Sequence, residues 1–262
     1  MLPLSDIAAA LHRLYIAVPG TSLRKEDRKK TAELAGLLAE IDRIVRATAR
    51  GRALDVVDAA AGKAYVGLLA AELVLARTSR SGRITLIERD RDRARACRLA
   101  ATGVCAPAVD ITVREADVAD PASWPAEPDL VVALHACGPA ADAIIAAAVA
   151  CRARHLLLVP CCTSKAVAAA PLAARRAREL GLPRHAEVRR RFIQAVVDGE
   201  RTLVLEAAGY QTEVIPFVPP TVTPHNLLWR ARRVGEPRRM AAAARCLQRL
   251  TAGQEMPDTG AG

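Results

Sequence analysis

Short apolar runs alternate with amphipathic runs along most of the chain. Five runs rich in Val, Ile and Leu are bounded by polar or turn-forming residues, at 53–58, 83–89, 110–117, 129–136 and 154–161. Runs with apolar residues at helical spacing follow four of them, at 63–78, 90–101, 139–150 and 165–181. Repeated alternation of strands and helices predicts a doubly wound parallel sheet.

Two further β-rich runs, 201–209 and 210–218, follow the alternating part, and only a turn at Gly209 separates them. Strands joined by so short a turn pair antiparallel. The stretch 219–235 opens as a proline-rich loop and has room for a final strand segment. We therefore predict an α/β fold, a Rossmann-like, doubly wound, seven-stranded sheet with an antiparallel C-terminal hairpin.

The first 50 residues have a different pattern, with apolar residues at helical spacing in 5–18 and 31–50 and a polar break between them. We predict an N-terminal helical extension over 1–50, a sheet domain over 51–235 and a basic, partly mobile tail over 236–262. Packing on the sheet domain is the simplest role for the extension. Its basic segment RKEDRKK (24–30) makes substrate binding the alternative role.

The basic charge of the chain is compatible with an anionic partner but does not identify one. The formal net charge is +10, from 38 Lys and Arg against 28 Asp and Glu. Such a balance fits nucleic acid, an acidic membrane surface or an anionic substrate as partner. Only five of the 38 basic residues are lysines, and both arginine and alanine are unusually frequent, which is typical of a biased genome composition. The charge alone therefore does not establish a polyanionic partner.

The cysteines and the apolar runs indicate a cellular compartment. The seven cysteines are odd in number and contain no C-x-x-C, which argues against a disulfide framework. The N-terminus lacks the basic and apolar regions of a signal peptide, and charged residues interrupt the long apolar runs. We expect a soluble, cytoplasmic protein with reduced cysteines and no membrane partner.

The sequence DAAAGKAY (58–65) connects the first predicted strand to its helix. Asp58, at the strand end, would repel a pyrophosphate and suits a ligand that carries an ammonium or sulfonium group. Gly62 allows a ligand to approach the backbone, with a helix N-terminus behind it. Neither the dinucleotide pattern G-x-G-x-x-G nor the P-loop G-x-x-x-x-G-K-[ST] is present.

Two more acids follow the next strands. Glu88 ends the second predicted strand, where a carboxylate accepts hydrogen bonds from both hydroxyls of a ribose. Asp117 ends the third, where an adenine amino group would lie. Ligands of doubly wound sheets bind beyond the C-terminal strand ends, so acids at three successive strand ends predict one nucleoside site.

With these acids the chain resembles class I methyltransferases that use S-adenosylmethionine (SAM), whose first motif runs roughly D-x-G-x-G-x-G. The corresponding residues here are Asp58, Ala60, Gly62 and Ala64. Alanine adopts a positive φ only at a cost, and both alanines can keep a negative φ if the ligand tolerates a nearby methyl group. The resemblance implies SAM as the cofactor, bound by Asp58, Ala60, Gly62, Lys63, Tyr65, Glu88, Arg89, Asp117, Val118 and His135.

A second set of motifs follows the fourth and fifth predicted strands, LHACG (134–138) and VPCC (159–162). As neighbours, these strands would bring together His135, Cys137, Cys161 and Cys162. The pair resembles a subgroup of methyltransferase-domain proteins with H-x-C-G and P-C-C motifs, related to tRNA ribose 2′-O-methyltransferases and RNA-associated methyltransferases. TPHNLL (223–228) looks like a late motif of that group, which implies that His225 and Asn226 line the same site. The resemblance covers about residues 52–233.

Four roles stay open for this cluster. Its members are suited to shape a pocket floor as small, semi-buried residues. His135 can hold or take the proton of a methyl acceptor. A cysteine thiolate can add to a cytosine ring before C5 methylation. One His and three Cys can bind zinc, although H-x-C is tight for two ligands of one ion. Our catalytic candidates are His135, Cys137, Cys161 and Asn226, and we predict no metal.

We therefore predict a SAM-dependent methyltransferase that acts on RNA, either tRNA or rRNA, through its basic segments. Aromatic residues make up only 3% of the chain, which favours ribose or phosphate contact over base stacking. The alternatives are a small-molecule methyltransferase, an RNA cytosine-C5 methyltransferase with a Cys nucleophile, and a non-catalytic binding module with this fold. The sequence predicts neither the methylated atom nor the oligomeric state.

Overall fold

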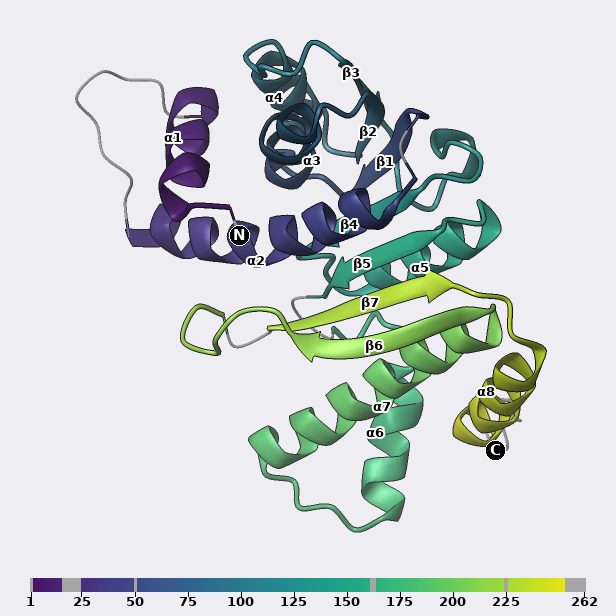
Figure 1. Cartoon of the computed structure of the whole chain (residues 1–262). Coiled ribbons are helices and arrows are strands. Elements are labelled where there is room, and N and C mark those ends of the chain that lie inside the picture. The colour runs from purple at the N-terminus through teal and green to yellow at the C-terminus, as the bar shows by residue number, and fades with distance from the viewer. Residues whose placement is uncertain (1, 16–24, 50, 161–163, 224–225, 253–262) are drawn as a thin grey trace.

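The computed structural model describes residues 2–15, 25–49, 51–160, 164–223 and 226–252. Its strands are β1 (Leu54–Ala59), β2 (Gly82–Glu88), β3 (Val109–Glu115), β4 (Leu130–Leu134), β5 (His155–Val159), β6 (Tyr210–Pro216) and β7 (Leu227–Arg233). They form one sheet in the order β3-β2-β1-β4-β5-β7-β6 (Figure 1). β1 to β5 pair parallel, whereas β7 pairs antiparallel with both β5 and β6. The predicted α/β class and the antiparallel C-terminal pair are confirmed.

The helices are α1 (Leu4–Tyr15), α2 (Lys25–Ala47), α3 (Tyr65–Ala70), α4 (Arg91–Ala101), α5 (Pro139–Ala150), α6 (Ala170–Glu179), α7 (Ala186–Ala207) and α8 (Pro237–Thr251). α3 continues through a π-helical turn, η1 (Ala71–Leu75), and a 3₁₀ turn, η2 (Ala76–Thr78). The helices predicted after the first, second and fourth strands are therefore present over nearly their whole predicted lengths.

Each face of the sheet has its own hydrophobic core. Successive side chains of a strand point to opposite faces, so Val56 of β1 enters one core and Val57 the other. Side chains of α1 to α4 cover the Val56 face. Side chains of α5 and α7, among them Ile144 and Leu205, cover the Val57 face. The near-continuous apolar runs of the central strands follow from this burial on both sides.

The two N-terminal helices share the core of the sheet. Ile7 of α1 and Leu34 and Leu37 of α2 are fully buried in the same cluster as the side chains of α3 and β1. Arg13 of α1 forms an ion pair of 2.5 Å with Glu72 of η1. The helical nature of the extension is confirmed, and α2 packs along one face of the sheet (Figure 1).

One predicted strand is wrong. Residues 201–207 form the last turns of α7, and the antiparallel partner of β6 is β7. The window has high β propensity, but it continues a helix that begins at Ala186. Leu205 packs on the sheet, and the buried Arg201 forms an ion pair of 2.7 Å with Asp142 of α5. These tertiary contacts override the local preference.

Most of the predicted basic tail is helical, since α8 spans Pro237–Thr251. The part of the predicted mobile tail from residue 253 onward lies outside the described residues. Among the helices that the structure describes, none combines the length and the apolar character needed to cross a membrane.

Candidate active site

The C-terminal ends of β1 to β4 lie at one edge of the sheet, here called the mouth. Residues 60–64 follow β1, Glu88 ends β2, Asp117 follows β3 and His135 follows β4. Because these strands run parallel, the structure brings predicted residues from four strand ends to the same edge. This is the edge at which doubly wound sheets bind their ligands.

The loop after β1 turns through three left-handed residues. The φ angles of Ala60, Gly62 and Ala64 are 55°, 62° and 57°. The expectation that the two alanines keep a negative φ is therefore wrong. Both occupy a conformation that glycine adopts freely and that destabilises alanine by on the order of 1 kcal/mol. The chain keeps the left-handed turns of a glycine-rich loop with alanines at two of the positions.

Neighbouring helices hold this strained loop. The Tyr15 hydroxyl of α1 donates to the Lys63 carbonyl at 2.8 Å, and its ring packs edge-on against Tyr65 with 4.5 Å between centroids. The Cys97 thiol of α4 donates to the Gly62 carbonyl at 3.3 Å. Burial raises the pKa of Cys97 to about 11, so the thiol keeps the proton it donates. Sequence reasoning missed Tyr15 and Cys97 because only tertiary packing brings them to the loop.

Asp58 is buried beneath the loop, with 2% of its surface exposed. Its Oδ2 accepts a hydrogen bond of 2.8 Å from the Gly67 N–H in the first turn of α3. Burial raises the pKa of Asp58 to about 7, while the Gly67 hydrogen bond opposes this shift and the charge of Glu88 adds to it. A cationic ligand beside the loop would favour the ionised form. Asp58 thus anchors α3 and supplies a charge that depends on its surroundings.

Replacing Gly67 with alanine tests how tightly Asp58 is held. A Cβ at this position would lie 2.4 Å from Leu86 Cδ2 and 3.1 Å from Asp58 Oδ2. We expect Gly67→Ala to lower the free energy of unfolding by about 1–3 kcal/mol, measured by urea denaturation. The control Gly199→Ala adds a Cβ with no atom within 4 Å in α7, and we expect it to raise that free energy by about 0.5–1 kcal/mol. If the two variants had the same free energy of unfolding, the expected clash of the new Cβ with Leu86 and Asp58 would be contradicted.

Glu88 holds the other side of the loop. Its Oε2 accepts from the Gly62 N–H at 2.7 Å, and its Oε1 accepts from the Asp90 N–H at 2.9 Å. A carboxylate has about four lone-pair positions, so each oxygen can accept one further hydrogen bond. That capacity matches the two hydroxyls of a ribose.

Asp117 and Val118 form the third part of the mouth. Asp117 Oδ1 accepts from the Ala119 N–H at 2.9 Å, and its Oδ2 lies 3.6 Å from the exposed Arg89. Val118 is buried, and its carbonyl accepts a hydrogen bond of 2.9 Å from Trp124 Nε1. A carboxylate beside buried apolar surface suits a flat ring that carries an amino group, such as adenine.

His135 contacts a residue that the sequence analysis did not select. Its Nε2 lies 3.0 Å from Glu33 Oε2 of α2, and Lys30 Nζ lies 2.8 Å from the same oxygen. Only 7% of the Glu33 side chain is exposed. His135 itself has a left-handed φ of 62°. The N-terminal extension therefore reaches the mouth and supplies a buried carboxylate to its histidine.

Glu33 is ionised in this setting. Burial raises its pKa, but the hydrogen bonds from His135 and Lys30 outweigh burial, so the pKa lies below its ordinary value. One sequence signal for this residue exists. On α2, the residues at positions 37, 41 and 44 are apolar and buried. Position 33 continues the same helical spacing but holds a glutamate, which interrupts the apolar stripe of the helix. A buried charge needs a partner, which here is His135.

The other catalytic candidates are Cys137, Cys161 and Asn226, and the structure describes Cys137 and Asn226. Cys137 is disulfide-bonded, so the expectation of reduced cysteines is wrong at this position. Asn226 Nδ2 donates to the Val218 carbonyl at 2.7 Å and holds the β6–β7 loop, which packs on α2 at Gly36. Cys161, Cys162 and His225 lie outside the described residues. Within the described ranges, no group of three or more His, Cys, Asp or Glu is placed to hold a metal ion.

Comparison with known proteins identifies the family of the chain. The model of a protein family described as "Methyltransferase domain" matches residues 29–169, more than half of the chain. The chain belongs to this methyltransferase family. The match begins within α2, so the helix that carries Lys30 and Glu33 lies inside the family's domain. The comparison with curated proteins found no significant match.

Several solved methyltransferase structures have a similar fold. Magnesium protoporphyrin IX methyltransferase from Synechocystis PCC 6803, with bound SAH, is 15% identical with a TM-score of 0.50, over 88% of this chain and 95% of that chain. A putative rRNA-methylase from Clostridium thermocellum is 11% identical with a TM-score of 0.43, over 78% and 97%. At such identities the similarity concerns the fold alone.

The mouth of this methyltransferase offers groups that fit SAM. Glu88 has the hydrogen-bonding capacity for two ribose hydroxyls, and the carboxyl groups of Asp58 and Glu88 would suit the ammonium and sulfonium groups of SAM. Val118, next to Asp117 in the chain and 7% exposed, would offer apolar surface to the adenine. The individual roles of these residues stay predictions.

Proposed function

We propose that the protein transfers the methyl group of SAM to RNA, either tRNA or rRNA, with His135 handling the proton of the acceptor. The observation that carries this proposal is the contact of 3.0 Å between His135 Nε2 and the buried Glu33 at the end of β4. An ionised carboxylate only accepts hydrogen bonds, so Nε2 of His135 carries a proton toward Glu33. In the neutral ring the proton-accepting nitrogen is then Nδ1.

The residues act by placing the acceptor and its proton. SAM, when bound, supplies an electrophilic methyl group. The attacking oxygen or nitrogen must lie in line with the bond that breaks, so positioning contributes most of the rate enhancement. His135 takes the acceptor proton or accepts its hydrogen bond, a role that contributes about 10²- to 10⁴-fold. Glu33 fixes the ring orientation, and Lys30 in turn holds Glu33.

RNA as acceptor is supported by the charge and the composition of the chain. The formal net charge is +10, and basic residues precede Glu33 on α2. Aromatic residues are scarce, which disfavours base-stacking platforms and favours acceptors on ribose or at exposed base edges. A cysteine nucleophile has less support, because a disulfide-bonded sulfur such as that of Cys137 is not a thiolate.

A labelling experiment tests the acceptor class. The protein is incubated with tritiated SAM and, in parallel, total RNA, a protein extract and a metabolite extract. We expect label in the RNA fraction and its loss on RNase treatment. Label confined to the metabolites would overturn the RNA proposal while leaving the methyltransferase activity in place. A sample in which His135 is replaced controls for contaminating enzymes.

One groove favours a second candidate, a small amphipathic acceptor. A hollow of about 530 Å³ lies between α6 and α7 and is lined mainly by apolar atoms of Ala170, Pro171 and Ile193. Ser164 stands at its end, and its Oγ is 2.9 Å from where a Cβ of Gly138 would lie, beside the mouth. Lys165 also lines the groove, so an apolar acid would fit it. Label in the metabolite fraction would favour this candidate.

A further inference from the structure

Two hollows lined by arginines flank the C-terminal end of α2, at the edge of the sheet opposite the mouth. The larger, of about 700 Å³, is lined by Arg46, Arg52, Arg77 and Arg80. The smaller, of about 330 Å³, is lined by Arg43, Arg230 and Arg232. Within the described part of the chain, Glu213 is the only acid that lines either of them. We call this surface, together with the neighbouring Arg83 and Arg154, the arginine face.

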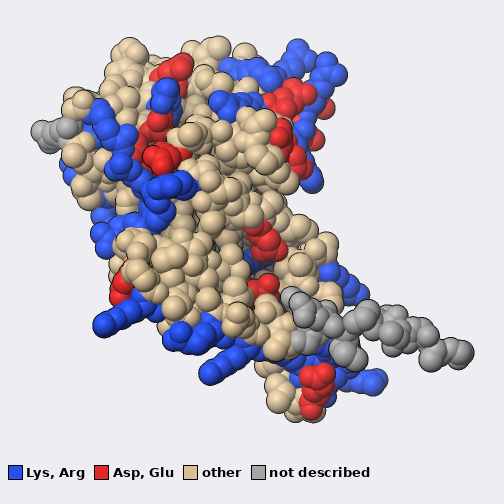
Figure 2. All heavy atoms as spheres, turned by 90° about the vertical axis from the view of Figure 1, so that its right-hand side faces the viewer, with Lys and Arg blue, Asp and Glu red and all other residues tan. Residues whose placement is uncertain are grey.

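Apart from Glu213, the acids of this surface lie beneath its arginines. Arg83 has 67% of its side chain exposed and its partner Asp55 has 19%, while Arg46 has 66% and Asp42 has 25%. Asp129 is 3% exposed and is shared by Arg52 and Arg154. Figure 2 views the side on which β4 and β5 begin and shows Lys and Arg gathered there, with acids between them. Glu213 is the exception, since 52% of its side chain is exposed against 27% for its partner Arg230, whereas the outermost charge of each of the other pairs is positive.

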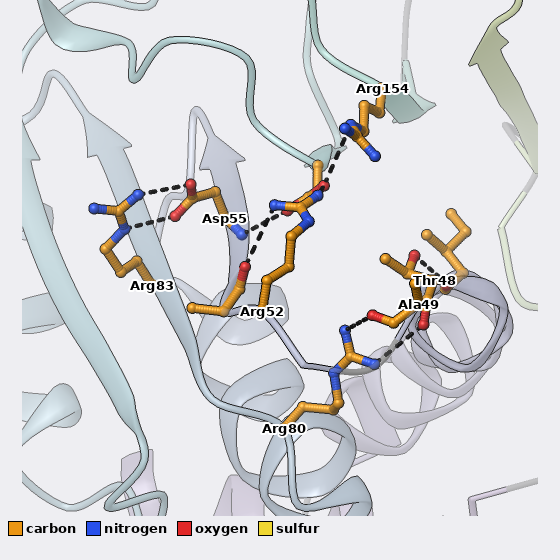
Figure 3. A network of polar contacts seen from close by, with 10 residues as sticks. Thr48, Ala49, Arg52, Asp55, Arg80, Arg83 and Arg154 are labelled. Carbon is orange, nitrogen blue, oxygen red and sulfur yellow. Dashed lines mark hydrogen bonds and ion pairs between the residues drawn. The ribbon is translucent and has the colours of Figure 1, made fainter.

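The pairing organises the arginines for a further ligand. Arg83 binds Asp55 through Nε and Nη2, at 2.6 and 2.7 Å. Since a guanidinium has five N–H donors, such a pair leaves three for another acceptor. The fixed geometry also lowers the side-chain entropy that binding removes. Figure 3 shows this pair beside Arg52 and Arg154.

The end of α2 does not offset this positive charge. The last carbonyls of a helix carry partial negative charge, which would repel an anion. Arg80, which is buried, donates to the carbonyls of Thr48 and Ala49 at 3.1 and 2.9 Å. Figure 3 shows its guanidinium directed at these two carbonyls. The helix end between the two hollows is therefore covered by a cation.

We propose that the arginine face binds the phosphate backbone of RNA at a distance from the methylated nucleotide. Only the choice of RNA as the polyanion rests on the proposed function. α2 has 23 residues and so spans about 34 Å from the region of the mouth to this face. A folded RNA is long enough to contact both ends. Contacts made equally in the bound and reacting complexes lower KM and leave kcat unchanged.

Three substitutions remove charge from this face and spare its buried pairs. Arg46, Arg77 and Arg232 contact Asp42, Asp6 and Gln211, all through partly exposed groups. The matched control replaces three arginines in surface ion pairs elsewhere, Arg98, Arg191 and Arg239, for the same change in net charge. Both sets are changed to glutamine in the full-length protein. Fluorescence anisotropy with a labelled tRNA transcript, without SAM, gives Kd over a range of salt concentrations.

We expect the triple variant Arg46→Gln, Arg77→Gln, Arg232→Gln to weaken tRNA binding by about 10-fold or more and to reduce the salt slope by about 2–3. The control should change Kd much less, and both proteins should bind SAM as the wild type does. Equal Kd values for the two variants would overturn the proposal. So would binding to phosphatidylserine vesicles in place of tRNA.

Methylation assays separate this proposal from the proposed function. Suppose that label from SAM never enters RNA but tRNA binding still depends on the three arginines. RNA binding by the arginine face is then supported, and RNA as the methyl acceptor is refuted. Suppose instead that label enters RNA with the same KM in the triple variant as in the wild type. RNA as the methyl acceptor is then supported, and RNA binding by the arginine face is refuted.

Discussion

Replacing His135 with asparagine is expected to lower kcat for methyl transfer by about 10²- to 10⁴-fold, because it removes the group that takes the acceptor proton. Asparagine suits this position, since it tolerates the left-handed φ of 62° better than most residues. Steady-state kinetics give kcat, and calorimetry with SAM separates a loss of proton handling from a loss of cofactor contact. His185→Gln, at the exposed start of α7, is the control. A kcat within twofold of the wild type would contradict the role of His135.

Glu33 acts through His135, and the two substitutions should not be additive. We expect Glu33→Gln to lower kcat by roughly 10-fold, since glutamine leaves the ring without its charged partner. In the His135→Asn background the same change should have little further effect, because residues that act as a unit are strongly non-additive. Independent losses from the two substitutions would indicate that Glu33 supports only the packing of α2.

The strand ends were predictable because two simple rules define them. Apolar runs buried on both faces mark the central strands, and the acids that follow them must lie at one edge when the strands are parallel. Asp58, Glu88 and Asp117 therefore lie together at the mouth as the sequence predicted. The disulfide bond of Cys137 was not predictable from the seven cysteines, because pairing depends on spatial proximity.

The loop conformation and the partner of His135 required the structure. The positive φ angles of Ala60 and Ala64 contradict the local preference of alanine, and contacts from α1 and α4 to this loop hold it. Glu33 lies 102 positions before His135 in the chain, so only the packing of α2 reveals their contact. Residues 201–207 have the composition of a strand, but the buried ion pair of Arg201 keeps them helical.

Several non-glycine residues at the mouth have a left-handed backbone conformation. Of the six non-glycine residues with positive φ in the described part of the chain, Ala60, Ala64 and His135 lie there. Left-handed backbone at non-glycine residues costs about 1–3 kcal/mol each and persists where the surroundings fix it. Such residues cluster at functional sites, which supports the mouth as the functional site.

Asp58→Asn is expected to change how the stability of the protein depends on pH. Burial raises the pKa of Asp58 to about 7 from an ordinary value of 3.8. The folded state then holds the proton between about pH 4 and pH 7 while the unfolded chain releases it, so stability is lost as the pH rises through this window. The full shift corresponds to roughly 4 kcal/mol, of which about 2–3 kcal/mol falls between pH 5 and pH 8. Asparagine does not titrate, so urea unfolding at pH 5 and pH 8 should differ less in the variant by about that amount.

The same substitution should weaken the binding of SAM. Removal of the negative charge near the ammonium and sulfonium groups is expected to raise the Kd for SAM by about 10-fold, the effect of about 1.4 kcal/mol. Wild-type affinity should rise from pH 6 to pH 8 as Asp58 ionises, whereas the affinity of the variant should not. Asp55→Asn is the matched control, because Asp55 lies on the same strand at the opposite edge and pairs with Arg83. If both variants bind SAM as the wild type does at pH 8, Asp58 anchors α3 and has no part in holding the cofactor.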